Sequence, residues 1–170
     1  MNDAAARVGA LADSHTPDMV SFLREMIAIP SESAGEREVI ARARAEMERL
    51  GFDEIKVDGL GNLLGRVGNG RHVVAIDGHI DTVGTGDLST WTRDPYRGEL
   101  IDGVIYGRGA SDQEGGIAAA VYGARIAREA GLLDDVQVWV TATVMEEDCD
   151  GLCWQYILRE GVLKPDVVVI

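Results

Sequence analysis

Two stretches rich in apolar residues, 73–76 and 136–144, most constrain how this chain of 170 residues folds. The first is an unbroken Val-Val-Ala-Ile run, and the second is dominated by valine. Such strands are typical of parallel sheets that helices cover on both faces. Residues 115–130 and 151–160 have helical patterns that each end at a glycine. This alternation predicts an α/β fold, a three-layer sandwich with a mixed, largely parallel central sheet.

The first third of the chain is expected to begin with two helices. Thr16 and Pro17 have the pattern of an N-cap followed by proline at the first helical position, so the first helix is predicted to begin there. Pro30 ends it. Ser33 and Glu36 have the spacing of a capping box, which predicts the start of the second helix.

Two hairpins are predicted from turn residues. Residues 55–67 are expected to form a strand pair that turns at 59–61. Asp102 and Gly103 lie between two short apolar segments, which is a strong signal for a tight hairpin turn. The intervening residues 83–98 have the composition of a loop.

The net charge of −13 argues against several classes of partner. A strongly acidic surface repels phosphate backbones and anionic lipid, so we expect neither nucleic acid nor a membrane as a partner. No run approaches the ~20 apolar residues of a membrane span, and residues 1–13 lack the pattern of a signal peptide. The expected location is the cytoplasm.

Three groups of acidic or imidazole side chains follow predicted strands or begin a predicted helix. His79 and Asp81 follow the first buried strand, Asp112 precedes a helix, and Glu146 and Glu147 follow the second buried strand. Chemistry in such sheets gathers at the carboxyl ends of the strands. Asp81 lies two residues after His79 on an extended segment, so it is placed to accept a hydrogen bond from the imidazole and fix its tautomer.

Each group by itself also has a simpler interpretation. A lone histidine is more often a hydrogen-bonded loop residue, Asp112 can cap its helix, and consecutive acids are usually solvated. A dinucleotide-binding loop would need glycine in place of Asp112, and no phosphate-binding loop is present in the sequence. Taken together, paired glutamates after a buried strand suit a division of labour in which one binds metal and the other transfers a proton.

The three motifs together resemble one family. Residues 79–83 (HIDTV), 107–116 (GRGASDQEGG) and 145–148 (MEED) are similar, in order and spacing, to the motifs of the two-metal hydrolases that include aminoacylase, acetylornithine deacetylase, succinyl-diaminopimelate desuccinylase and carboxypeptidase G. Ile29-Pro30-Ser31 resembles the family's N-terminal signature. The resemblance covers nearly the whole chain.

The resemblance implies a role for each residue. His79 would bind one metal and Asp81 would orient it, Asp112 would bridge two divalent metals, and Glu147 would bind the second. Zinc is expected, with cobalt or manganese as alternatives. A water between the metals would attack an amide carbonyl of a peptide or N-acyl amino acid, with Glu146 as general base. The peptide bond after Asp112 is expected to be cis.

The sequence also departs from the family pattern. Gln113 and Glu114 stand where the family commonly has a lysine before the paired glycines. Together with residues 146–154 (EEDCDGLCW), they most resemble a branch of selenium-metabolism-linked hydrolases. The resemblance implies further ligands beyond Ile170 and a separate lid domain through which the protein would form a homodimer. Residues 1–170 are therefore expected to be the N-terminal part of the catalytic domain and inactive alone. The alternatives are a non-catalytic scaffold of the same fold and, more remotely, a nucleotide-binding domain.

Overall fold

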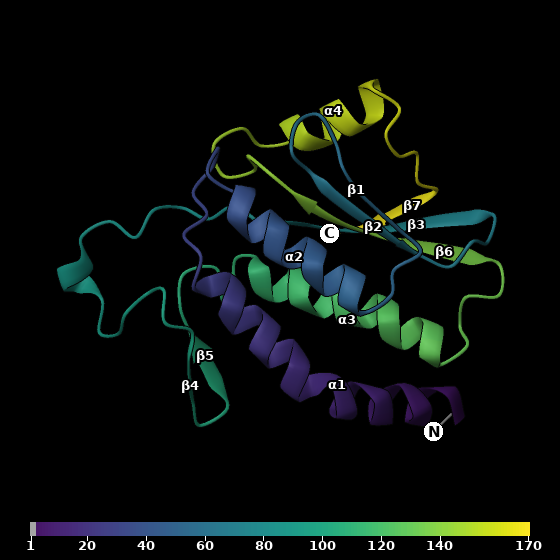
Figure 1. Cartoon of the computed structure of the whole chain (residues 1–170), viewed down its shortest axis with the longest axis horizontal. Helices are drawn as coiled ribbons and strands as arrows, with labels where there is room; N and C mark the ends of the chain where they lie inside the picture. Colours follow the sequence, from purple (N-terminus) through teal and green to yellow (C-terminus); the bar gives the residue numbers. More distant parts are fainter. Residues whose placement is uncertain (1–2) are drawn as a thin grey trace.

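A computed structural model describes residues 3–170, which form helices and strands in alternation (Figure 1). Among these residues, no helix combines the length and apolar character that a bilayer span requires. The helices are α1 (Asp3–Ile27), α2 (Arg37–Arg49), α3 (Glu114–Glu129) and α4 (Leu152–Arg159), with a short 3₁₀ turn, η1 (Leu88–Thr90). The strands are β1 (Glu54–Val57), β2 (Leu63–Val67), β3 (His72–His79), β4 (Glu99–Ile101), β5 (Val104–Tyr106), β6 (Val136–Thr143) and β7 (Val167–Val169).

Five of the strands form one mixed sheet in the order β1-β2-β6-β3-β7. Strand β3 is parallel to both β6 and β7, whereas β2 pairs antiparallel with β1 and β6. The predicted α/β fold class is confirmed. The register places His79 of β3 directly beside Thr143 of β6, so the segments that follow these two strands leave the sheet at the same edge.

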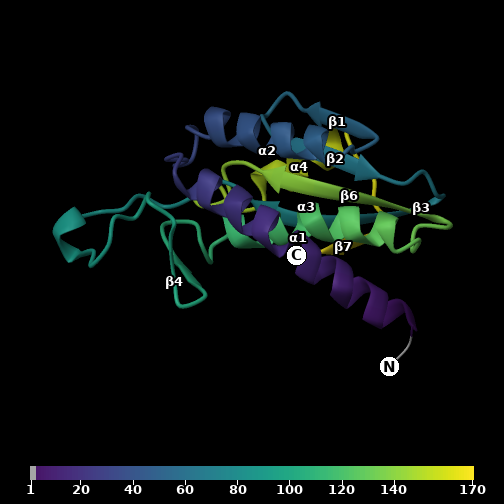
Figure 2. The same cartoon turned by 60° about the horizontal axis from the view of Figure 1, so that its bottom comes forward.

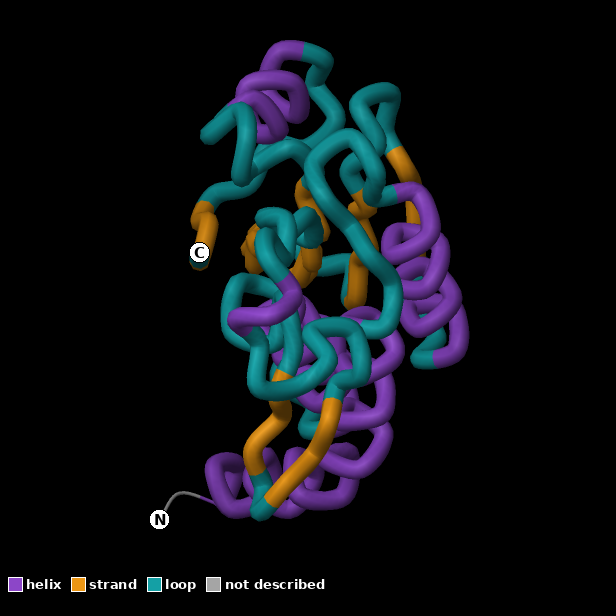
Figure 3. Tube along the Cα trace, turned by 90° about the vertical axis from the view of Figure 1, so that its left-hand side faces the viewer, coloured by secondary structure: helices purple, strands orange, loops and turns teal. Residues whose placement is uncertain are grey.

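Helices cover both faces of the sheet, and the alternation of side chains along each strand decides which face a residue enters. Figures 1 and 2 show α1, α2 and α3 on one face and α4 on the other. Along β6, Val138 and Val140 pack in the larger core under α2 and α3, while Trp139 packs with Ile157 of α4. Figure 3 shows the β4-β5 hairpin projecting beside α1, outside this sandwich.

The first helix is longer than predicted. It begins at Asp3, and Pro17 lies inside it rather than at its start. Proline removes one helical hydrogen bond, and the Oγ1 of Thr16 donates to the Ala12 carbonyl within the same turn (2.9 Å) instead of capping a helix. The alanine-rich residues before Pro17 favour a helix, and this part of α1 packs along α3, where His15 contacts Glu129 (3.0 Å).

The predicted capping box is also wrong. Helix α2 begins at Arg37, and Glu36 stands at its N-cap without a side-chain cap hydrogen bond. The Ser33 hydroxyl donates to Asp81 and a Glu36 oxygen accepts from the Met145 amide, so both side chains are used by distant segments. The long-range partners lie in the interior, where an unpaired polar group costs more than an open cap at the helix surface.

The turns predicted from glycine are confirmed. Gly51 follows the end of α2 with φ of +71°, in the left-handed region typical of a residue that terminates a helix. Asp102 and Gly103 have φ of +50° and +82°, as a two-residue hairpin turn requires, and they join β4 to β5 in antiparallel register.

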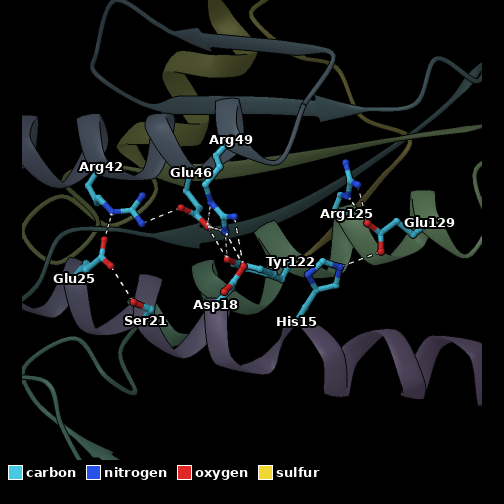
Figure 4. Close-up of polar contacts among 10 residues, drawn as sticks. All are labelled: His15, Asp18, Ser21, Glu25, Arg42, Glu46, Arg49, Tyr122, Arg125 and Glu129. Carbon is cyan, nitrogen blue, oxygen red and sulfur yellow. Dashed lines mark hydrogen bonds and ion pairs between the residues drawn. The ribbon is translucent and has the colours of Figure 1, made fainter.

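A buried carboxylate links α1, α2 and α3, the three helices that lie on one face of the sheet, through a group of polar contacts (Figure 4). Glu46 of α2 is 3% exposed and accepts hydrogen bonds from Arg49 (2.6 Å), Arg42 (2.8 Å) and the Tyr122 hydroxyl of α3 (2.6 Å). Arg42 also bonds Glu25 of α1. Burial opposes ionisation of Glu46, but the hydrogen bonds from Arg49, Tyr122 and Arg42 outweigh it and hold the pKa below the usual 4.5.

We expect Glu46→Gln to destabilise the fold by about 3 kcal/mol, because it leaves Arg42, Arg49 and Tyr122 without their shared anion. Glu48→Gln is the matched control, since its pairing with Arg44 on the same helix is exposed and worth about 0.5 kcal/mol or less. Urea denaturation measures both. Because the folded pKa of Glu46 is lowered, its contribution is full above the unfolded pKa near 4.5 and is lost as the pH falls through the folded value. Equal effects of the two substitutions would contradict the assignment.

Candidate metal centre

The site is built around His79, the last residue of β3, whose side chain is 6% exposed. Its Nδ1 lies 2.8 Å from the carbonyl oxygen of Asp81, and its Nε2 lies 3.0 Å from Oδ1 of Asp112. A carbonyl can only accept, so Nδ1 carries a proton and donates it. In the neutral ring Nε2 then holds the lone pair and faces the carboxylates, which is the tautomer a metal ligand needs.

Asp81 orients His79 differently from the prediction. The backbone carbonyl of Asp81, rather than its carboxylate, accepts from Nδ1, and the nearer carboxylate oxygen lies 3.6 Å away. The fully buried carboxylate instead accepts from the Ser33 hydroxyl (2.6 Å) and from the amides of Glu146 and Glu147 (3.1 Å each). These donors and His79 lower its pKa against the effect of burial. Asp81 therefore links the end of β3 to the loop after β6.

Asp112 lies in the turn before α3, and its carboxylate is exposed. The peptide bond between Asp112 and Gln113 is cis, as expected. The side-chain oxygen of Gln113 accepts a hydrogen bond from the His79 amide (3.0 Å), so the turn is attached to the end of β3. Gly78 makes room for this contact, since a Cβ there would overlap the Gln113 side-chain oxygen.

Glu146 and Glu147 lie in the turn that follows β6 and are both half-buried. An oxygen of Glu146 lies 3.7 Å from His79 Nε2. Glu147 presents its carboxylate on the same side, and ligand atoms of His79, Asp112 and Glu147 all lie within 4.8 Å of one another. The structure thus brings together all five residues predicted for the site, because β3 and β6 are parallel and end at the same edge.

The electrostatics of this group favour a cation. Burial disfavours a charged His79, but Asp81, Asp112 and Glu146 outweigh it and raise the pKa of the imidazole to about 9. The pKa of Glu146 is raised by burial and by the nearby carboxylates of Glu147, Asp150 and Asp81, although His79 opposes the shift. Clustered carboxylates repel one another unless a cation or a proton lies between them.

The residues fit a divalent metal by donor chemistry as well as by position. An imidazole nitrogen and two carboxylates form a mixed set that zinc, cobalt and manganese all accept. The hydrogen bond from Nδ1 of His79 to the Asp81 carbonyl is the kind of support that ligating histidines have in metal sites.

Glu114, where the sequence departs from the family pattern, is a buried carboxyl group in the structure. This side chain is 1% exposed, it lies against Gly109, and burial raises its pKa to about 8. One of its oxygens has no hydrogen-bond partner among the described residues. Gly109 has φ of +82°, a conformation that favours glycine, and a Cβ there would also crowd the Glu114 carboxyl.

The comparisons with known proteins agree with this geometry. Residues 75–169, which contain all five site residues, match peptidase family M20/M25/M40. The chain belongs to this family. The resemblance to the two-metal hydrolases is confirmed.

"Uncharacterized protein YgeY" of Escherichia coli (strain K12) is 51% identical over 158 residues, which cover 93% of this chain and 39% of YgeY. The succinyl-diaminopimelate desuccinylase of Rhodopseudomonas palustris (strain BisA53) is 40% identical over 113 residues, which cover 62% of this chain and 29% of that enzyme.

Two solved peptidase structures have the same fold. The dipeptidase Dug1p of Saccharomyces cerevisiae superposes with a TM-score of 0.80 at 21% identity, over 99% of this chain and 41% of that one. The M20 metallo-carboxypeptidase Sso-CP2 of Sulfolobus solfataricus has a TM-score of 0.73 at 25% identity, over 88% of this chain and 36% of that one. The chain thus spans about two fifths of the length of YgeY and of these two solved proteins.

Three residues that contact the candidate site or the loop that carries its paired glutamates were not predicted to do so. Ser33 and Glu36 were assigned to a capping box, and Asn62 was placed at the start of a strand. Asn62 is fully buried in the structure. Its position just after a glycine turn gave a signal only for a hairpin, because a single sequence does not show which distant amide such a side chain meets.

Proposed function

We propose that this chain supplies the metal ligands and the proton-transfer base of an M20 amide hydrolase that cleaves a peptide or an N-acyl amino acid. The observation that carries the proposal is the convergence of His79, Asp112 and Glu147 within 4.8 Å, with Glu146 beside them. Such a set combines metal ligands with a carboxylate free to move a proton.

Each side chain has a role in this proposal. His79 would hold one divalent ion through Nε2, Glu147 would hold a second through its carboxylate, and Asp112, whose exposed carboxylate belongs to the same group of ligand atoms, would be their common ligand. Divalent ions held there would acidify water and polarise the scissile carbonyl. Glu146 would take the proton from the attacking water and return it to the leaving amine, a task that suits a carboxyl group whose pKa is raised. Asp81 would hold His79 through its carbonyl and both glutamates through its carboxylate.

The number of ligands limits what these residues can do by themselves. A catalytic zinc ion usually has three protein ligands, and two ions sharing His79, Asp112 and Glu147 would have two each. We therefore propose that residues 1–170 form part of a catalytic domain and that further ligands complete its metal site. The family resemblance supports two further proposals: a lid domain belongs to the full-length protein, and that protein acts in the cytoplasm as a homodimer. Zinc is the expected ion, and the acyl group or peptide is left to a substrate screen.

The test compares this 170-residue chain with the full-length gene product. We expect the full-length protein to bind about two divalent ions per chain and to hydrolyse members of a panel of N-acetyl and N-succinyl amino acids and dipeptides. A chelator should stop turnover, and zinc, cobalt or manganese should restore it. The 170-residue chain should bind metal weakly and show no turnover. A full-length protein that binds no metal would contradict the proposal and favour a scaffold role.

A further inference from the structure

Four consecutive backbone amides, at residues 144–147, lie in the loop that contains Glu146 and Glu147. Each of them donates a hydrogen bond to a side-chain oxygen. Strand β6 ends at Thr143, so these four amides lie beyond the hydrogen bonds that join β6 to its neighbouring strands. The Val144 amide donates to Asn62 Oδ1 (3.0 Å), and the Met145 amide donates to Glu36 Oε1 (3.0 Å). The two amides that follow both donate to the Asp81 carboxylate.

The loop also has a backbone conformation that its own sequence does not favour. Met145 has φ of +62°, in the left-handed region that costs a residue with a Cβ about 1–2 kcal/mol. Such a conformation persists only where the surroundings impose it. Met145 lies directly before Glu146 and Glu147, so its conformation sets the direction in which both side chains leave the backbone.

The acceptors are themselves held in place. Asn62 is fully buried, and its Nδ2 donates to Asp58 (2.8 Å), which leaves Oδ1 facing the Val144 amide. Asp58 is in turn fixed by the amides of the 60–62 turn. Glu36 is 6% exposed at the start of α2. Two separate elements, the α2 N-terminus and the β1-β2 turn, therefore reach the same loop.

We propose that Glu36 and Asn62 are positioning residues for the Glu146–Glu147 pair: by binding the amides of Met145 and Val144 they impose the left-handed turn that aims both carboxylates at His79. The effect on turnover rests on the proposed function. The effect on the backbone of residues 144–147 does not, because it follows from hydrogen bonds within the described chain.

The test uses variants of Glu36 in the full-length gene product. Glu36→Ala removes the acceptor, Glu36→Asp withdraws it by one methylene, and Glu36→Gln retains an oxygen in place. Glu38→Ala is the matched control, since this glutamate lies on the same helix, is exposed, and has no side-chain hydrogen bond among residues 3–170. Hydrogen exchange with fragmentation that resolves single amides reports on the loop without reference to catalysis.

We expect the Met145 amide to exchange about tenfold faster or more in the Ala and Asp variants, while amides of α3 keep the wild-type rate. The Gln variant and Glu38→Ala should match the wild type. In turnover assays with the best substrate of the panel, kcat should fall about tenfold or more in the Ala and Asp variants with KM little changed, and Gln should restore it. The Asp variant keeps the test open if Glu36→Ala does not fold.

Unchanged exchange at Met145 in the Ala and Asp variants would overturn the proposal, as would a Gln variant as impaired as Ala. Uniformly faster exchange across the protein would also overturn it, because that result indicates a general loss of stability. An inactive wild-type protein whose Met145 amide still responds to Glu36 would contradict the proposed function alone and would support the positioning of the loop.

Discussion

Glu146→Gln in the full-length gene product is expected to lower kcat by about 10²–10⁴-fold while metal content stays at the wild-type level. The substitution keeps the shape of the side chain but removes its capacity to accept a proton. The 3.7 Å distance from Glu146 to Nε2 of His79 places it beside the ligand group, whereas Glu147 supplies the atom that converges with His79 and Asp112. A loss of turnover without a loss of bound metal therefore distinguishes a general base from a metal ligand.

Turnover and bound metal are measured on the same preparation, by substrate assay and by elemental analysis. Glu38→Gln makes the same chemical change on an exposed helix face and should leave both quantities unchanged. Loss of metal together with turnover in Glu146→Gln would mean that the base and the ligand are exchanged between the two glutamates. Activity retained at the wild-type level would remove Glu146 from the mechanism.

His79→Ala should have a comparably large effect, on metal binding itself. It removes the nitrogen that we propose as a metal ligand, and we expect metal affinity to fall by more than the roughly 10–100-fold typical of losing an outer hydrogen-bonding partner. His72→Ala is the matched control, since His72 begins the same strand and its side chain is 60% exposed. Metal content after dialysis and a titration with zinc measure the change.

The two histidine variants separate a site effect from a general one. His72→Ala should bind metal and turn over substrate as the wild type does. Thermal unfolding of the metal-free proteins shows whether His79→Ala retains the fold. A His79→Ala protein that keeps full metal occupancy would contradict the assignment of His79 as a ligand, and the carboxylates alone would then have to hold the ions.

The sequence was sufficient for the fold class and for the edge of the sheet at which the candidate site residues converge. Valine-rich runs predicted β3 and β6, and glycine turns predicted the ends of the helices and the β4-β5 hairpin. Once two strands are parallel, the residues that follow them must share an edge, so the convergence of His79 with the paired glutamates follows from the strand pattern and their place in the chain.

Contacts between distant segments account for the predictions that were wrong or incomplete. Ser33 and Glu36 have a valid capping-box spacing, yet their partners are Asp81 and Met145, the latter 109 residues away from Glu36. Asp81 was expected to bind the imidazole through its carboxylate, but two amides and a hydroxyl occupy it. Local spacing states which hydrogen bonds are available to a side chain, and burial decides which of them is made.

The sequence by itself therefore determined which chemistry this protein carries and at which edge of its sheet: an imidazole and four carboxylates placed after strands β3 and β6 and before helix α3. The tertiary structure alone decided how these side chains are oriented and held. The left-handed turn at Met145, the support of His79 by a carbonyl and the buried acceptors Glu36 and Asn62 all depend on chain segments that meet only after folding. Patterns of adjacent residues report on local conformation, whereas the satisfaction of buried polar groups is settled by the whole fold.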